Sequence, residues 1–299
     1  MHKSKEHENV DKSLSFDNVN IYSDLKIPNK NIKDIIVNIL LKDRTTNNNI
    51  IFATDSYSPQ KDFKDEINID DVKNRLFLPR YTKNKQEQKK RTSKKAEVFT
   101  PTWICNKMNN LVDEQWFGRP NVFNIEKDKS WITTTEKINF PDDKNFIDYI
   151  TALRLEITCG EAPFITSRYD TVTGETILFK NRIGLLDRKL RVIIENLKDN
   201  TDILSCCLIA FKSIYGYEYQ GDNLIIARFN LLQTFLDFAK HVHLSMDFNF
   251  LIGIAEIISW NIWQMNGLTD TTPNTNILCK IKDWQEEKII KFSDLKKGE

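Results

Sequence analysis

The fold is decided by one stretch of the chain, which reads Leu153-Arg154-Leu155-Glu156-Ile157-Thr158-Cys159-Gly160-Glu161-Ala162-Pro163-Phe164. Its first half predicts a strand over residues 153–158, which the glycine and proline then end abruptly. An acid at a strand end and a glycine turn suit a small polar cofactor, because the main chain can approach a ligand closely at a glycine. Taken alone, the same pattern is more often a tight structural turn.

Strands and helices alternate after this stretch, and their order predicts an α/β fold. Such an alternation implies a parallel, doubly wound sheet. The expected elements are a hairpin turn at Thr173-Gly174, a helix over residues 186–197, a strand over 214–218, a helix over 224–239 that Asp222 caps, a largely apolar helix over 250–263, and a terminal hairpin made of 277–281 and 288–292.

The chain divides into three regions by composition. Residues 1–30 are polar and charged and are expected to form a flexible arm. Residues 31–95 form a small mixed region, with a helix over 32–41, a strand over 50–53 and a basic linker between Arg80 and Lys95. One domain of catalytic size is expected over residues 96–299.

Composition excludes several classes of protein. The 43 Lys and Arg against 42 Asp and Glu give a net charge of +1, so any attraction to nucleic acid must be local. The five cysteines form no Cys-x-x-Cys pair, which argues against a disulfide framework and against a metal site. No apolar run is long enough for a membrane span or a signal peptide. We therefore expect a reduced, cytoplasmic protein with no membrane partner.

A second acid, Glu218, follows the second predicted strand in Tyr215-Gly216-Tyr217-Glu218. At this position in a nucleotide-binding sheet, a carboxylate accepts hydrogen bonds from a ribose diol. The alternative is a solvent-facing glutamate at a strand end. The separation between Gly160 and Glu218 is longer than the roughly 20 residues of a minimal unit, and the hairpin near Thr173 contributes to it.

Three segments together resemble the motifs of adenine-specific (N6) DNA methyltransferases. They are Glu97-Val98-Phe99-Thr100-Pro101 before a helix, Leu155-Glu156-Ile157-Thr158-Cys159-Gly160-Glu161-Ala162-Pro163-Phe164, and Tyr215-Gly216-Tyr217-Glu218 followed by Ile226-Ala227-Arg228-Phe229-Asn230-Leu231. The whole chain is similar to proteins described as the M subunit of a restriction-modification system. The resemblance implies a Rossmann-like S-adenosylmethionine-dependent methyltransferase core over residues 96–299, with a small mixed N-terminal region.

The resemblance also implies which residues hold the cofactor, S-adenosylmethionine. Thr100 and Pro101, the expected cap and first turn of a helix, would lie near its methionine end. Glu156, Thr158, Cys159 and Gly160 belong to the segment whose main chain would lie under it, and Glu218 would hold its ribose. Two residues depart from the family pattern. Glu161 stands where a small residue is usual, and Pro163 replaces a second glycine.

The catalytic turn of the family is missing. Transfer to an adenine amino group uses an Asp/Asn-Pro-Pro-Tyr/Phe turn in this family, and no Pro-Pro pair occurs in the chain. Asp247-Phe248-Asn249-Phe250 keeps only the polar and aromatic ends, so the catalytic residues stay unassigned. Two alternatives remain: a DNA methyltransferase-like subunit, degenerate or completed by a restriction or specificity subunit, and a non-catalytic DNA-binding or scaffolding subunit.

The basic stretch between Arg80 and Lys95 is the first choice for contact with DNA. Lys89, Lys90 and Arg91 follow one another within it and would neutralise phosphates. A solvated linker would show the same run of charge.

Overall fold

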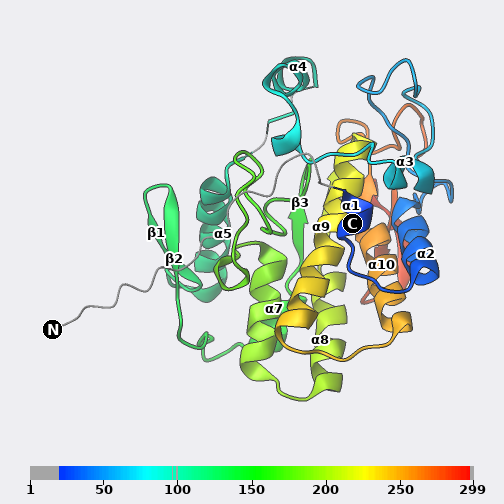
Figure 1. Ribbon diagram of the computed structural model, residues 1–299. Helices are drawn as coiled ribbons and strands as arrows, with labels where there is room; N and C mark the ends of the chain where they lie inside the picture. Colours follow the sequence, from blue (N-terminus) through cyan, green and yellow to red (C-terminus); the bar gives the residue numbers. More distant parts are fainter. Residues whose placement is uncertain (1–19, 96, 99, 297–299) are drawn as a thin grey trace.

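A three-stranded parallel sheet lies at the centre of this protein, whose computed structural model describes residues 20–95, 97–98 and 100–296. Its strands are β3 (Arg154–Glu156), β4 (Ile214–Glu218) and β5 (Ile262–Gln264), in that order across the sheet. Leu155 pairs with Tyr215, and Gly216 pairs with Ile262. The chain is thus mixed α/β, as the alternation predicted, and Figure 1 shows the helices gathered around β3.

One face of the sheet is covered by helices. They are α7 (Leu185–Asn196), α8 (Asn200–Lys212), α9 (Gly221–His241) and α10 (Phe248–Asn261). Asp199 caps α8 and Asp247 caps α10 through their side chains, which fixes where these helices begin. Ile214 and Ile262 point from the sheet into the large apolar core that these helices share.

The opposite face is covered by a hairpin. Strands β6 (Lys280–Asp283) and β7 (Lys288–Lys291) pair antiparallel and lead into α11 (Phe292–Leu295). This confirms the predicted terminal hairpin, but its first strand begins three residues later than the predicted 277–281 and ends two residues later. Tyr217 and Trp263 from the sheet pack here against Ile281 and Phe292 in a second, smaller core.

The N-terminal region packs directly on the rest of the chain. Helix α2 (Lys30–Leu41) lies against α10 (Figure 1), and both contribute to the same large core. Residues 1–19 of the predicted arm lie outside the described residues. The rest of it is ordered, since α1 (Ile21–Asp24) begins at a cap formed by Asn20 and Leu25 is buried.

The strand predicted over residues 50–53 does not form. Ile51 makes only an isolated antiparallel bridge with Glu66, and Ala53 has a left-handed φ of 50°. The main-chain N–H and C=O of Ile51 are both bonded to the side-chain amide of Gln264 on β5. The main-chain hydrogen bonds of Ile51 therefore go to a side chain and not to a neighbouring strand.

The basic stretch predicted as a linker is largely helical. Residues Arg80–Thr82 form the 3-10 turn η2, and Lys85–Lys95 form helix α4, which projects at the top of Figure 1. The remaining elements are α3 (Ile69–Lys73), α5 (Thr102–Phe117), β1 (Asn124–Lys127), β2 (Ser130–Thr133), α6 (Phe146–Thr151) and η3 (Phe179–Asn181).

Candidate functional site

The turn after β3 is tight and has an unusual backbone. Thr158, Gly160 and Ala162 all have left-handed φ values, of 48°, 55° and 63°. Such a conformation is costly for residues with a side chain, and it often marks a functional site. The N–H of Cys159 donates to the carbonyl of Tyr217 at 2.8 Å, which extends the pairing of β3 with β4 into the turn. Cys159 is buried, whereas the side chain of Thr158 is exposed.

Glu156 lies beneath this turn. Its carboxylate accepts hydrogen bonds from the N–H groups of Phe164 and Ile165, at 3.5 and 3.2 Å. Burial raises the pKa of Glu156 well above its ordinary value, and these two bonds oppose the rise only in part. Glu156, one of the predicted cofactor residues, thus stabilises the turn through hydrogen bonds to its main chain.

Glu218 ends β4 and reaches across to the same turn. Its Oε2 accepts the N–H of Gly160 at 2.9 Å, and its Oε1 accepts the N–H of Gln220 at 3.0 Å. Burial raises the pKa of Glu218 to about 7, against the lowering effect of these two N–H groups. A carboxylate that titrates near neutrality therefore lies in contact with the glycine of the turn.

The start of α5 lies at the same end of the sheet. Helix α5 begins at Thr102, and Pro101 occupies its cap position, so Thr100 is not the cap that the sequence predicted. The N–H of Thr102 is instead satisfied by the carboxylate of Asp170, at 2.7 Å. Asp170 belongs to the predicted hairpin, and Thr171 from the same hairpin donates to the carbonyl of Thr100 at 3.1 Å.

Contacts from α5 join it to the turn. The side-chain amide of Asn109 donates to the carbonyls of Phe164 and Ile183, at 2.9 and 3.0 Å. Burial, and then the nearby carboxylates of Glu156 and Asp170, raise the pKa of Cys105 in the first turn of α5. The structure thus brings the three motif segments to the carboxyl end of β3 and β4.

Glu161, which stands where the family pattern usually has a small residue, makes contacts that explain its presence. Its carboxylate accepts the main-chain N–H of Arg80 and the hydroxyl of Tyr169, both at 2.7 Å. The side-chain amide of Asn230 donates to the Glu161 carbonyl and to the Tyr169 hydroxyl, each at 3.0 Å. The Glu161 carboxylate thereby fastens the turn to η2 and to Tyr169, and a small residue could not make these two bonds.

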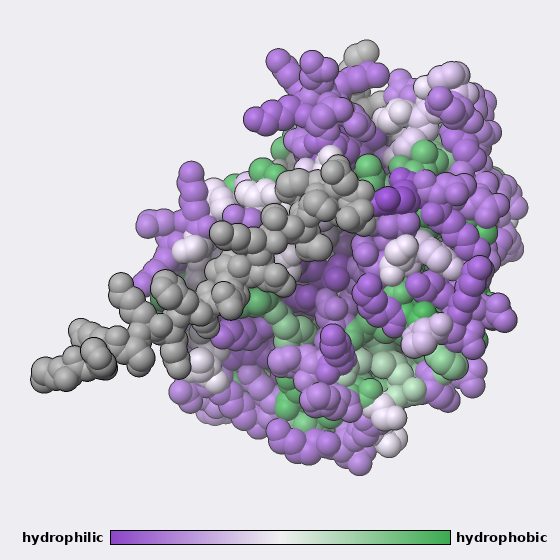
Figure 2. All heavy atoms as spheres, viewed as in Figure 1, coloured by the Kyte–Doolittle hydropathy of each residue, from purple (hydrophilic) through white to green (hydrophobic). Residues whose placement is uncertain are grey.

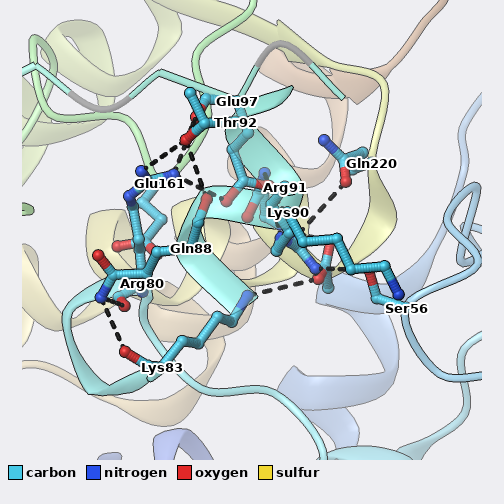
Figure 3. A network of polar contacts seen from close by, with 12 residues as sticks. Ser56, Arg80, Lys83, Gln88, Lys90, Arg91, Thr92, Glu97, Glu161 and Gln220 are labelled. Atoms are coloured by element: carbon cyan, nitrogen blue, oxygen red, sulfur yellow. Dashed lines mark hydrogen bonds and ion pairs between the residues drawn. The ribbon is translucent and has the colours of Figure 1, made fainter. Parts of the chain in front are cut away.

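Arg91 lies at the centre of a buried polar network (Figure 3). Its Nε donates to Glu97 at 2.7 Å and its Nη2 donates to Asp222 at 2.7 Å, while Nη1 donates to Ser56 at 3.0 Å. Arg91 was predicted to contact phosphates, and Asp222 was predicted to cap α9. Both predictions need correction, because the two side chains are buried against each other and Gln220 occupies the cap position.

The two lysines beside Arg91 differ from it. Lys89 and Lys90 are exposed on α4, and Figure 2 shows mainly hydrophilic side chains over this helix. Successive side chains of a helix point in different directions, so the buried Arg91 anchors α4 while Lys89 and Lys90 remain exposed to solvent. Only Lys89 and Lys90 of the predicted triplet remain available for phosphates.

Asp247, which begins the weak catalytic candidate 247–250, lies at the opposite end of α9 from Glu218. Asp247 accepts the N–H of Phe250 at 2.8 Å and caps α10. The helix α9, with 21 residues, separates it from Glu218, which corresponds to roughly 30 Å at 1.5 Å per residue. Residues 247–250 are therefore a helix start and not part of the candidate site.

Two of the cavities formed by the described residues lie elsewhere. One of about 420 Å³ lies between β3, β4 and the β6–β7 hairpin, and one of about 580 Å³ lies between the β1–β2 hairpin, η3 and α7. None of the predicted cofactor residues lines either cavity. Within the described ranges, no three His, Cys, Asp or Glu side chains are grouped as metal ligands, and no helix is both long and apolar enough to cross a bilayer.

Sequence reasoning missed the residues that assemble this site. Asp170, Asn230 and the Arg91 network join segments far apart in the chain, and only their polar character could have drawn attention to them. No protein-family model, curated protein or solved structure matches this chain significantly.

Proposed function

We propose that this chain is the S-adenosylmethionine-binding core of a DNA adenine methyltransferase-like subunit of a restriction-modification system, with a Rossmann-like fold around β3–β5. The observation that carries the proposal is the hydrogen bond between Gly160 and Glu218, which joins the first motif to the second. A left-handed glycine turn opposite a strand-end carboxylate is the arrangement that binds a nucleoside in open α/β sheets.

The residues fit the cofactor. Each oxygen of the Glu218 carboxylate accepts one N–H and keeps a further lone pair for a ribose hydroxyl. Gly160 lets the ligand approach the main chain, and Thr100 and Pro101, at the start of α5, would meet its methionine end. Bound S-adenosylmethionine would supply an electrophilic methyl group, and the chain's own part is to bind and orient it.

The acceptor side of the reaction is assigned to a partner. No Pro-Pro pair occurs in the sequence, and Asp247 lies far from Glu218. We therefore assign the turn that would hold the flipped adenine to a restriction or specificity subunit. The non-catalytic alternative, a DNA-binding or scaffolding subunit, is favoured by the same missing turn. It predicts the same DNA contacts without methyl transfer.

Replacing Glu218 tests the cofactor site. We expect Glu218→Ala to weaken S-adenosylmethionine binding by about 1–3 kcal/mol, or roughly 5- to 150-fold, because the ribose loses its acceptor. Glu286→Ala, at an exposed glutamate on the hairpin, serves as the matched control and should bind as the unaltered protein does. Calorimetric titration measures both affinities, and equal values for the two variants would remove Glu218 from the site.

The raised pKa of Glu218 predicts a pH dependence. The diol requires an ionised carboxylate, so affinity is full above about pH 7 and falls up to tenfold for each pH unit below it. The isosteric variant Glu218→Gln should have a nearly flat profile. Titrations between about pH 6 and pH 8 provide the comparison. A slope that persists in Glu218→Gln would place the titrating group elsewhere.

Salt dependence tests the DNA contacts. Lys89→Gln with Lys90→Gln should reduce the slope of log affinity against log salt by about 2, since each phosphate contact contributes roughly 0.9. The control pair Lys288→Gln with Lys291→Gln removes the same charge from exposed positions on β7. Fluorescence anisotropy with duplex DNA gives the slopes. If both pairs lowered the slope equally, only net charge would matter and α4 would lose its assignment.

A further inference from the structure

The two edge strands of the parallel sheet, β5 and β3, differ in how their outer sides are hydrogen-bonded. At β5, the Gln264 side chain acts as a substitute peptide group: it accepts the N–H of Ile51 at 2.9 Å and donates to the C=O of Ile51 at 2.8 Å. All three residues of β5 are buried. The outward main-chain carbonyls of β5 are occupied too, because that of Ile262 accepts Arg228 Nε at 2.7 Å and that of Gln264 accepts the Cys279 thiol at 3.4 Å. This edge is therefore closed by side chains.

The β3 edge is open. Arg154 donates its N–H to Ser213, just before β4, so Arg154 and Glu156 face that strand. Main-chain groups alternate in direction along a strand, and those of Leu155 and Ile157 consequently point away from the sheet. Across the described part of the chain, no residue pairs with β3 on that outer side. An unpaired edge strand is a template for another strand.

Apolar side chains follow the same edge. Leu153, Leu155 and Ile157 are 62 %, 46 % and 63 % exposed, and they recur at every second residue, so they share one face. In soluble proteins, parallel strands are normally buried on both faces. Three large aliphatic residues exposed in a row on such a strand indicate a surface that another chain covers.

A cavity continues this apolar row under the hairpin. The space of about 420 Å³ is lined by Leu155 from β3 and the preceding Leu153, by Tyr215 and Trp263 from the sheet, and by Trp284 from the β6–β7 hairpin. Its walls are largely aliphatic and aromatic, so the side chains of an added strand on this face would enter a preformed apolar pocket.

One positive charge at the cavity has no ion-pair partner among the described residues. Arg154 lines the cavity and donates Nη1 to the neighbouring Leu153 carbonyl, and its buried Nη2 has no hydrogen bond within the part of the chain that the structure describes. The other cations at the rim are compensated, since Lys282 pairs with Glu287 at 2.7 Å and Lys212 approaches the same carboxylate. The surface is complementary to an extended segment that carries one carboxylate among alternating apolar residues.

We propose that a partner polypeptide adds a strand of this kind to β3, with its apolar side chains in the cavity and a carboxylate on Arg154. Main-chain hydrogen bonds to Leu155 and Ile157 would supply affinity, and the pocket and Arg154 would supply selectivity. This interaction surface goes beyond the proposed function and does not depend on cofactor binding.

The test uses the full chain with a tethered probe. A strand of alternating valine and threonine with one central aspartate is fused after residue 299 through a flexible glycine-serine linker, which raises its effective concentration to about the millimolar range. Hydrogen exchange should slow at least tenfold at the amides of Leu155 and Ile157 when the strand is present. The same fusion with two central prolines should leave both amides unprotected, because proline cannot pair.

Two variants separate the parts of the proposal. Leu155→Lys places a charge on the edge and should abolish the protection, while thermal unfolding checks that the variant is folded. Arg154→Gln should reduce the protection from the strand with aspartate but not from one with threonine in its place.

Three outcomes would overturn the inference. Unchanged exchange with the tethered strand would show that the edge does not accept a strand. Concentration-dependent protection in the unfused protein, with a dimer in sedimentation, would assign the edge to a second copy of this chain. Loss of protection on deleting residues 1–19 from the unfused protein would assign it to that segment.

Discussion

Arg228→Leu is expected to lower the free energy of unfolding by about 3–5 kcal/mol. Arg228 is fully buried in α9 and donates to the carbonyls of Leu40, Ile262 and Ser259, at 2.6, 2.7 and 3.2 Å. One guanidinium therefore satisfies carbonyls at the ends of α2 and α10 and at β5. Leucine would leave these carbonyls buried without donors, at a cost of about 1–3 kcal/mol for each group that water cannot reach.

The matched control is Arg119→Leu. Arg119 is exposed and donates one side-chain hydrogen bond, to the carbonyl of Asn139 at 3.0 Å. We expect a change within about 0.5 kcal/mol for this variant. Urea denaturation followed by tryptophan fluorescence compares the two. A similar small loss in both would mean that Arg228 does not join the N-terminal region to the sheet.

The second large effect is expected for Arg91→Leu, at about 3–5 kcal/mol near neutral pH, because Asp222 and Glu97 would be left buried with only Lys83 and Arg80, at 3.7 and 3.3 Å, as counter-charges. Burial alone would raise the pKa of Asp222, but Lys83 and Arg91 outweigh it and the pKa is lowered. The stabilisation by Asp222 is thus present above its ordinary pKa and is lost as pH falls through the lowered value. Without Arg91 the carboxylate of Asp222 would protonate more readily, so the penalty should shrink toward about pH 4.

Lys90→Leu is the control on the same helix, since Lys90 is exposed one position away. Its expected change is within about 0.5 kcal/mol at either pH. Arg91→Leu combined with Asp222→Asn should recover part of the loss, because the uncompensated charge is removed. A penalty for Arg91→Leu that is the same at both pH values would point to lost packing instead of charge.

The sequence was sufficient where periodicity and turn residues act locally. The strand predicted over residues 214–218 coincides with β4, and the terminal hairpin forms where the apolar runs flank a polar turn. Gly160 and Glu218 were each expected to follow a strand, and they meet because parallel strands place their carboxyl ends at one edge.

Long-range polar contacts could not be predicted in this way. Nothing local distinguishes Arg91 from Lys89 and Lys90, and its partner Asp222 is 131 positions away. The failure of the strand at residues 50–53 has a similar cause, since the Gln264 amide that takes the place of a neighbouring strand is 213 positions from Ile51. Glu161 departs from the family pattern because it contacts Arg80, 81 positions earlier.

The most direct test of the central claim is a calorimetric titration of the unaltered protein with S-adenosylmethionine at about pH 8, where Glu218 is largely ionised. The proposed cofactor site predicts saturable binding with one molecule per chain and a dissociation constant in the micromolar range, or about −8 kcal/mol. Absence of binding at this pH would contradict it. The turn at Gly160 and the carboxylate of Glu218 would then be structural features of a subunit used for DNA binding or assembly.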